Sequence, residues 1–222
     1  MTDGTDKKNI LIITGGNVDK DFAALWVKEN HFDFCIAADR GAEAAQMLGI
    51  PIDHLIGDFD SVSEQVLDAI IGEEKKVTRL SPEKDATDTE FAIKEALKLS
   101  PHSICILGAT GERADHTFTT LMSMAGALGS GAYIYAVDKN NKIYAAGGDI
   151  CIEKKKQHGD YVSLSVISDS AMISISGMKY CLDRQEVRRG SSLCQSNEIT
   201  DDVAHISISN GIALVFESKD GE

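Results

Sequence analysis

The chain has 222 residues, 35 of them acidic and 22 basic, which gives a formal net charge of −13. That length is enough to bury a substantial core in one large domain or two modest ones. The negative charge argues against a protein that binds nucleic-acid backbones or anionic membranes, but an acidic site can still hold a nucleotide through Mg²⁺. The polar start MTDGTDKKN, the lack of a long apolar run and five scattered cysteines without a CxxC pair predict a cytoplasmic protein without a disulfide framework or zinc site.

From residue 9 to about 137, short apolar runs alternate with segments of helical periodicity. The runs predicted to be strands buried on both faces are ILII (10–13), FCIAA (34–38), HLI (54–56), KVTRL (76–80), SICIL (103–107) and AYIYAV (132–137). Regular alternation of strand and helix predicts a parallel sheet with right-handed crossovers.

The pattern changes after residue 138. The runs YVSLSVI, AMISIS and HISIS alternate apolar and polar residues with period two, as half-buried antiparallel strands do. Asn210-Gly211 stands between HISIS and IALVFE and predicts a type I′ hairpin. The predicted fold class is therefore α/β: an N-terminal, mostly parallel sheet flanked by helices (1–142), followed by a smaller C-terminal antiparallel β-sandwich (143–222).

Charged residues follow the predicted parallel strands at the point where each strand ends. Ligands of open parallel sheets bind outside the carboxyl ends of the strands, so these residues are expected to converge at one edge. The set comprises Asp39 after 34–38, Asp58 and Asp60 after 54–56, Asp85 and Asp88 after 76–80, and Arg113 with Asp115 after 103–107.

Helix capping is the alternative explanation for this polarity. Both Ser61–Glu64 and Thr87–Glu90 fit the capping box S/T-x-x-E, and capping is the preferred interpretation for any single aspartate. Capping requires one side chain per helix, however, and four aspartates at one edge would repel one another unless a cation joins them. The sequence therefore predicts a Mg²⁺ site, with the pair in GDFDSV (57–62) as a metal clamp.

The segment GATGERADHT (108–117) has the features of a phosphate-binding loop. Its glycines permit a tight turn, amides at the following helix start can meet phosphate, and Arg113 offers a charged fork. It is neither a Walker A loop nor GxGxxG. His116 could act as an acid or base, although a hydrogen-bonded structural histidine is the favoured interpretation.

Together, GDFDSV, SPEKDATDTEFA (81–92) and GATGERADHT, followed by GMKYCL (177–182) and SNE (196–198), resemble the motifs of the thiamine pyrophosphokinase family. Enzymes of this family transfer a pyrophosphoryl group from ATP to thiamine. The resemblance implies an α/β catalytic domain, a thiamine-binding β-sandwich and a homodimer with thiamine between the catalytic domain of one subunit and the sandwich of the other.

The resemblance also implies roles for individual residues. Mg²⁺ would be the cofactor and ATP the co-substrate, and the thiamine hydroxyl would lose its proton to either Asp85 or Asp115. Arg40 in ADRGA (38–42) departs from the ADGGA common in the family, which bears on the nucleotide contacts. The implied residues are Asp58, Asp60 and Asp88 for the metal, Asp85, Arg113 and Asp115 for catalysis, and Asp39, Ser61, Lys84, Thr87, Ser196 and Asn197 for the substrates.

Two other functions fit parts of the pattern. In a Mg²⁺-dependent phosphatase of the DxD type Asp58 would be a phosphorylated nucleophile, although that residue usually follows the first strand. A non-catalytic nucleotide-binding or thiamine-binding protein of the same fold would bind its ligands without releasing AMP.

Overall fold

The computed structural model describes residues 7–58, 76–81 and 85–221. The chain forms two compact units, residues 1–123 with 129–139 and residues 124–128 with 140–222. Compactness does not test whether either part folds alone, so the predicted domains 1–142 and 143–222 stay a prediction. None of the helices in the described ranges is long and apolar enough to cross a membrane.

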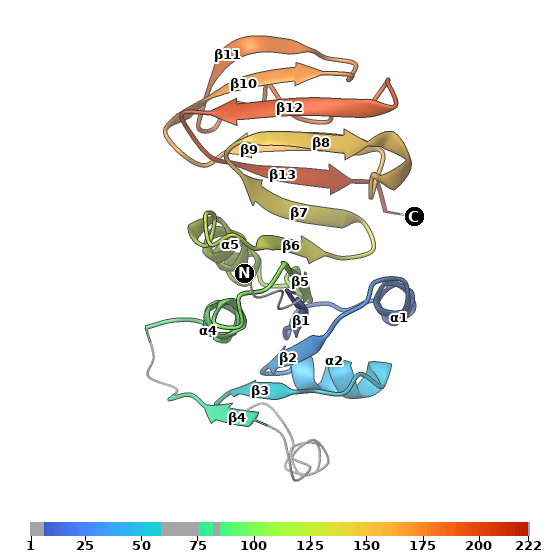
Figure 1. The fold of residues 1–222 in the computed structure, drawn as a ribbon, viewed down its shortest axis with the longest axis vertical. Coiled ribbons are helices and arrows are strands. Elements are labelled where there is room, and N and C mark those ends of the chain that lie inside the picture. Colours follow the sequence, from blue (N-terminus) through green and yellow to red (C-terminus); the bar gives the residue numbers. More distant parts are fainter. Residues whose placement is uncertain (1–6, 59–75, 82–84, 222) are drawn as a thin grey trace, which may run out of the picture. The chain divides into compact units, whose positions relative to one another are not determined.

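The first unit is a doubly wound parallel sheet (Figure 1). Its strands lie in the order β4-β3-β2-β1-β5-β6, and every printed pair within this set is parallel. Figure 1 shows helices α1 and α2 on one face and α4 and α5 on the other. The elements are β1 (Asn9–Ile13), α1 (Lys20–Glu29), β2 (Phe34–Ala38), α2 (Gly41–Leu48), β3 (His54–Gly57), β4 (Lys76–Arg79), α4 (Asp88–Leu97), β5 (Ser103–Leu107), α5 (Ala114–Gly126) and β6 (Tyr133–Val137).

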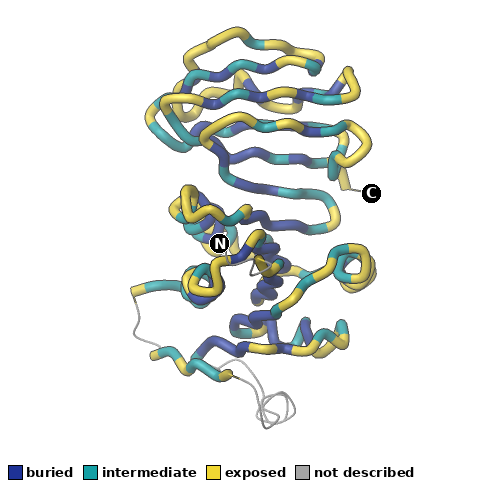
Figure 2. Tube along the Cα trace, viewed as in Figure 1, coloured by how far each residue is buried: buried dark blue, intermediate teal, exposed yellow. Residues whose placement is uncertain are grey.

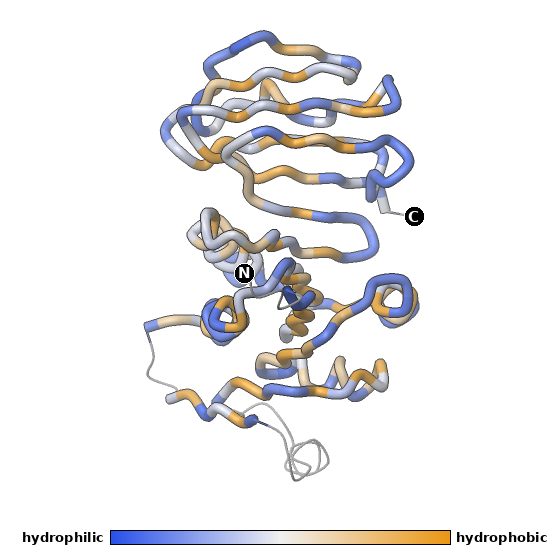
Figure 3. Tube along the Cα trace, in the orientation of Figure 1, coloured by the Kyte–Doolittle hydropathy of each residue, from blue (hydrophilic) through white to orange (hydrophobic). Residues whose placement is uncertain are grey.

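All of the apolar runs predicted in this half are confirmed as strands. The predicted burial on both faces is wrong for 76–80, because β4 lies at the edge of the sheet and its residues are exposed or half-buried, but it holds for the central strands. Residues 10–13 of β1 are each at most 1% exposed, because helices cover both faces of the sheet. Figures 2 and 3 show the same buried, hydrophobic character along the central strands. Three of the five cysteines, Cys35, Cys105 and Cys194, are buried as well.

The strand order places a topological switch point between β1 and β5. From β1 the chain moves outward through β2 to β3 and β4, then returns through α4 to β5 on the other side of β1. The helices that follow β1 and β5, α1 and α5, therefore lie on opposite faces of the sheet, and a ligand crevice is expected at the carboxyl ends of these strands.

The second unit is antiparallel. One four-stranded sheet has the order β11-β10-β12-β8, and β13 pairs with both β7 and β9. Alternate residues are buried along β9, β10 and β12, as the period-two pattern predicted, so this part of the fold class is confirmed as well. The elements are β7 (Asn141–Ala146), β8 (Asp149–Glu153), a short 3-10 helix (Lys154–Lys156), β9 (Tyr161–Val166), β10 (Ser170–Ser176), β11 (Leu182–Arg188), β12 (Val203–Ser209) and β13 (Ala213–Ser218).

The hairpin predicted at Asn210-Gly211 is wrong. Asn210 has the positive φ of 56° that the signal requires, but the strands on its two sides do not pair with each other. β12 pairs with β10 and β8, whereas β13 pairs with β7 and β9. Each strand thus finds two partners in its own sheet, and this pairing outweighs the local preference of the Asn-Gly turn.

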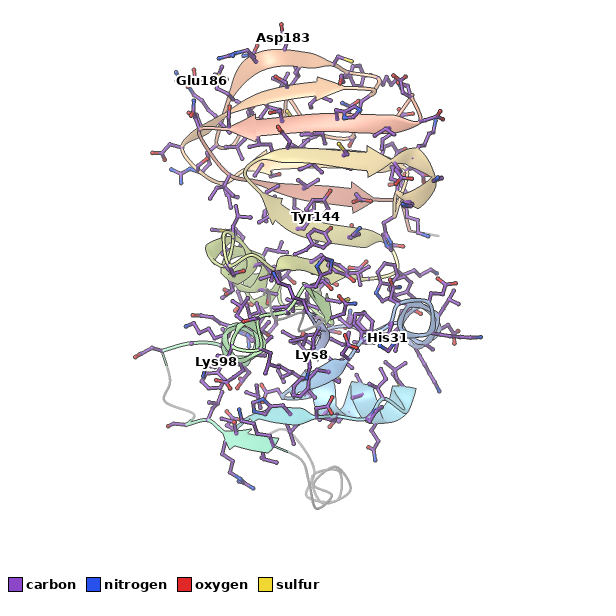
Figure 4. All side chains as sticks on the ribbon, viewed as in Figure 1. Lys8, His31, Lys98, Tyr144, Asp183 and Glu186 are labelled. Carbon is purple, nitrogen blue, oxygen red and sulfur yellow. The ribbon has the colours of Figure 1, made fainter. Side chains whose placement is uncertain are left out.

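β11 is an edge strand of the four-stranded sheet, and it is protected by charge. Asp183 and Glu186, labelled in Figure 4, are both exposed on it. Charged side chains on an exposed edge discourage pairing with further strands from other molecules.

Candidate functional site

A cavity of about 550 Å³ lies in the first unit at the switch point between β1 and β5. Loops after three neighbouring strands and the first turns of α4 and α5 line it. The lining residues are Thr14, Gly15, Gly16, Asn17, Ala38, Asp39, Arg40, Thr87, Asp88, Thr89, Gly108, Ala109, Thr110, Gly111, Glu112, Arg113, His116, Thr117 and Thr120.

Part of the cavity wall is made of backbone from the loops after β1 and β5. The amide of Gly16 donates to the carbonyl of Gly108 (3.1 Å), and the amide of Asn17 donates to that of Thr110 (2.7 Å). The buried hydroxyl of Thr14 donates to the carbonyl of Gly108 (2.6 Å). A Cβ at Gly16 would lie only 2.1 Å from the Gly108 oxygen, so the two loops can approach this closely only with glycine at this position.

The loop after β2 contributes Asp39 and Arg40. Asp39 has a φ of 52°, a left-handed conformation that aspartate tolerates better than most residues. Its amide donates to the carbonyl of Ile56 at the end of β3 (2.9 Å), which ties this loop to the neighbouring strand. The predicted substrate-binding residue Asp39 borders the cavity, and this hydrogen bond fixes its backbone.

Thr87 and Asp88 lie at the beginning of α4. The Thr87 hydroxyl accepts a hydrogen bond from the amide of Glu90 (3.1 Å), so the predicted capping role of Thr87 is confirmed. Capping uses Thr87 and leaves Asp88, the first helical residue, to border the cavity. The positive end of the helix dipole stabilises a carboxylate at this position.

Arg113 and Asp115 form a two-pronged ion pair at the start of α5. Nε of Arg113 donates to Oδ1 of Asp115 (3.2 Å), and Nη2 donates to Oδ2 (2.7 Å). The hydrogen bonds from Arg113 lower the pKa of the Asp115 carboxyl, and Asp115 in turn raises the pKa of Arg113. Both side chains are exposed, so solvent screens this attraction.

The structure brings together four of the predicted site residues, because Asp39, Thr87, Asp88 and Arg113 all line this cavity. It does not place three other described residues, Asp58, Asp85 and Asp115, among the lining residues. Ser196 and Asn197 belong to the second unit. The predicted residues Asp60, Ser61 and Lys84 lie outside the described residues.

In the second unit the two motifs GMKYCL and SNE are in contact. The Asn197 side chain donates to the carbonyl of Tyr180 (2.7 Å) and accepts from the Tyr180 amide (3.0 Å). Lys179 pairs with Glu198 (2.6 Å) beside them. Asn197 is only 3% exposed, whereas Ser196 is exposed with a φ of 53°. Asn197 thus fixes the backbone under Tyr180, whose own side chain is 60% exposed.

Comparisons with known proteins match two domains of one family, one in each half of the chain. The sequence pattern described as "Thiamin pyrophosphokinase, catalytic domain" matches residues 22–136, and that described as "Thiamin pyrophosphokinase, vitamin B1 binding domain" matches residues 149–213. The chain is 30% identical to the thiamine pyrophosphokinase of Bacillus subtilis (strain 168), over 96% of this chain and 100% of that protein. The chain belongs to the thiamin pyrophosphokinase family.

Solved structures of the family support the assignment. The crystal structure of thiamine pyrophosphokinase from Bacillus subtilis has a TM-score of 0.87 at 29% identity, covering 96% of this chain and 100% of that one. That of thiamin pyrophosphokinase from Geobacillus thermodenitrificans has a TM-score of 0.83 at 28% identity, covering 96% and 99%. The comparisons favour neither a DxD phosphatase nor a non-catalytic protein.

The donor atoms of the predicted metal residues suit Mg²⁺, which prefers carboxylate oxygens. Asp58 directly follows β3 and Asp88 begins α4. Within the described ranges, no group of three or more His, Cys, Asp or Glu side chains is placed to hold a metal ion. Since Asp60 is not described, the trio Asp58, Asp60 and Asp88 stays a prediction.

Sequence reasoning missed one loop of the cavity and one contact in the second unit. The loop TGGN (14–17) follows β1 and lines the cavity, and the rule applied to the other strand ends would have found it. Tyr180 lies within a motif that was quoted, but no sequence signal showed that Asn197 would hold its backbone.

Proposed function

We propose that this chain, as a member of the thiamin pyrophosphokinase family, transfers the pyrophosphoryl group of ATP to the hydroxyl of thiamine, giving thiamine diphosphate and AMP. The observation that carries the proposal is the cavity at the β1/β5 switch point, where Asp39 and Asp88 face the same space as Arg113. Nucleotides bind at such switch points, and phosphoryl-type transfer requires mainly positioning and charge neutralisation.

The loops of the cavity would bind and orient the nucleotide. Backbone amides at the starts of α4 and α5 and the guanidinium of Arg113 would contact phosphate oxygens. Asp58, Asp60 and Asp88 would hold Mg²⁺, which supplies neutralisation of phosphate charge when bound.

Asp85 or Asp115 would accept the hydroxyl proton. Arg113 lowers the pKa of the Asp115 carboxyl through their hydrogen bonds. Asp115 would also orient Arg113 through the two hydrogen bonds of their ion pair.

Thiamine would be bound with the help of the second unit. Ser196 is exposed beside the buried Asn197, and the nearby Tyr180 is exposed as well, with Nζ of Lys179 5.8 Å from the centroid of its ring. A cytoplasmic location, predicted from the sequence, and a homodimer, implied by the family resemblance, remain part of this proposal; light scattering of the purified protein would test the dimer.

The test is to incubate the protein with thiamine, ATP and Mg²⁺ and to quantify AMP and thiamine diphosphate together. Equal amounts of both, with none formed in EDTA, are expected for pyrophosphoryl transfer. ADP or free phosphate without thiamine diphosphate would reject the proposed reaction, and ligand binding without AMP release would identify a non-catalytic protein.

A further inference from the structure

Two guanidinium groups border the cavity, and they differ in what neutralises them. Arg113 is held by Asp115 through two hydrogen bonds. The side chain of Arg40, by contrast, makes no hydrogen bond or ion pair within the described part of the chain. We propose that Arg40 binds the phosphate chain of the nucleotide and is the main cationic side chain for it in this cavity. This inference rests on the proposed function only in naming the ligand as ATP.

The backbone holds Arg40 in a defined position at the cavity. Gly41, the first residue of α2, packs so tightly on β1 that a Cβ there would lie 2.0 Å from the Ile13 oxygen. A Cβ at Gly15 would lie 3.3 Å from Cβ of Arg40, so the loop after β1 passes close beside the base of the Arg40 side chain. The carbonyls of Asp39 and Arg40 accept the first hydrogen bonds of α2. The backbone of Arg40 is thus held in place beside the switch point between β1 and β5.

The charges around the cavity leave a need for a cation of this kind. Among the lining residues that the structure describes, Asp39, Asp88 and Glu112 are acidic. They would repel a polyphosphate unless cations stand between, and part of the charge of Arg113 is already matched by Asp115. Arg40 is the N-cap residue of α2 and makes no side-chain cap, so the positive end of this helix adds to its charge.

The planar fork of arginine suits phosphate oxygens, with which it can form two parallel hydrogen bonds. Such a contact depends on the phosphates and not on the base or the ribose. The binding of ATP should therefore depend on Arg40, while the binding of adenosine should not.

The experiment is calorimetric titration of the wild-type protein and Arg40→Gln with Mg-ATP and with adenosine, in the absence of thiamine. We expect Arg40→Gln to weaken ATP binding at least ~10-fold and to change adenosine binding less than ~2-fold, since loss of one charged phosphate contact is worth about one factor of ten or more. Arg40→Lys, which keeps the charge without the fork, should fall between the two. Arg113→Gln should weaken ATP binding less than Arg40→Gln does.

Arg188→Gln is the matched control, because Arg188 is an exposed arginine at the end of β11 in the second unit. It removes the same charge from the protein, and ATP binding should stay unchanged. An equal loss of ATP affinity in this control would show that the effect comes from net charge alone, and it would overturn the proposal.

The remaining outcomes separate this inference from the proposed function. Unchanged ATP binding by Arg40→Gln would overturn the role of Arg40, and formation of thiamine diphosphate by the wild type would then still support the reaction. Equal weakening of ATP and adenosine would indicate a disturbed cavity and overturn the phosphate contact. Weaker ATP binding by the variant, with no thiamine diphosphate formed by the wild type, would support Arg40 and reject the reaction. A wild type that binds no ATP would overturn both.

Discussion

The two units of the chain use their polar motif residues in different ways. In the parallel unit, Asp39, Asp88 and Arg113 border a cavity, and the walls between them are tight backbone contacts. In the antiparallel unit, Asn197 is buried and its side chain is occupied by the backbone of Tyr180. The polar motif residues of the parallel unit thus border a cavity, whereas Asn197 holds the backbone of its own unit.

The largest effect is expected at Gly16 of the parallel unit, where the backbone leaves no space for a side chain. Gly16→Ala would place a Cβ at 2.1 Å from the Gly108 oxygen and 2.3 Å from the Thr110 oxygen, both backbone atoms. We expect a loss of about 3 kcal/mol in the free energy of unfolding, measured by urea denaturation, with weaker ATP binding as a consequence. Gly148→Ala is the control, because a Cβ there meets nothing within 4 Å. Equal stability of both variants would contradict the tight packing of these loops.

The second prediction tests whether the parallel unit keeps its carboxylates for ligands. Asp88→Asn should lower turnover at least ~100-fold, about 2.7 kcal/mol of activation barrier, because it removes a charge expected to hold Mg²⁺. The production of AMP and thiamine diphosphate measures this.

Glu90→Gln is the matched control for Asp88. It removes a charge from the same first turn of α4, but Glu90 pairs with Lys94 (2.6 Å) and does not line the cavity. Its turnover should stay within about threefold of the wild type, since an exposed ion pair contributes little. Equal losses in both variants would point to helix stability and not to a ligand.

The third prediction concerns the antiparallel unit, where the effect should be on stability. Asn197→Ala leaves the partly buried amide and carbonyl of Tyr180 without their side-chain partner and removes a side chain that is itself buried. We expect a loss of about 2.5 kcal/mol in the free energy of unfolding. Ser196→Ala should change stability by less than about 0.5 kcal/mol and raise the KM for thiamine more than that for ATP. A stable Asn197→Ala that has lost only thiamine affinity would make Asn197 a ligand residue and break the comparison.

The smallest expected effect is on the pH dependence of the free energy of unfolding, and it concerns His54 of the first unit. Burial in β3, helped by the charge of Lys76, lowers the pKa of His54 from 6.5 to about 4, and its Nε2 lies 2.8 Å from the Thr78 hydroxyl. The unfolded chain takes up this proton near pH 6.5 and the folded chain only near pH 4, so acid favours unfolding. Between pH 7 and pH 5 this costs about 2 kcal/mol.

Urea denaturation at several pH values would measure the contribution of His54. His54→Gln should flatten the pH dependence in this window, whereas His205→Gln, which changes an exposed histidine of the second unit, should leave it as it is. An unchanged slope in His54→Gln would show that other groups carry the acid sensitivity.

The sequence predicted the central strands well, because burial on both faces requires apolar residues. Runs such as ILII and SICIL are apolar throughout because both of their faces are covered, and the capping box at Thr87 depends on neighbours in the same turn. The Asn210-Gly211 hairpin failed because its local preference is weaker than the pairing of β12 and β13 with strands far along the chain. The sequence also did not predict the ion pair of Arg113 with Asp115, since sequence spacing alone does not fix how side chains are oriented.

By itself the sequence determined the class of each half, the residues that follow the strands and the resemblance to a family, because hydropathy and its periodicity are properties of neighbouring residues and the order of motifs is read directly along the chain. Tertiary structure alone decided that β1 and β5 would be neighbours, that the loop at 14–17 would join the site, and that Arg40 and Arg113 would border one cavity with different partners. The physical reason is that a strand order and a side-chain pairing depend on contacts between residues distant in the chain, which local preferences do not specify.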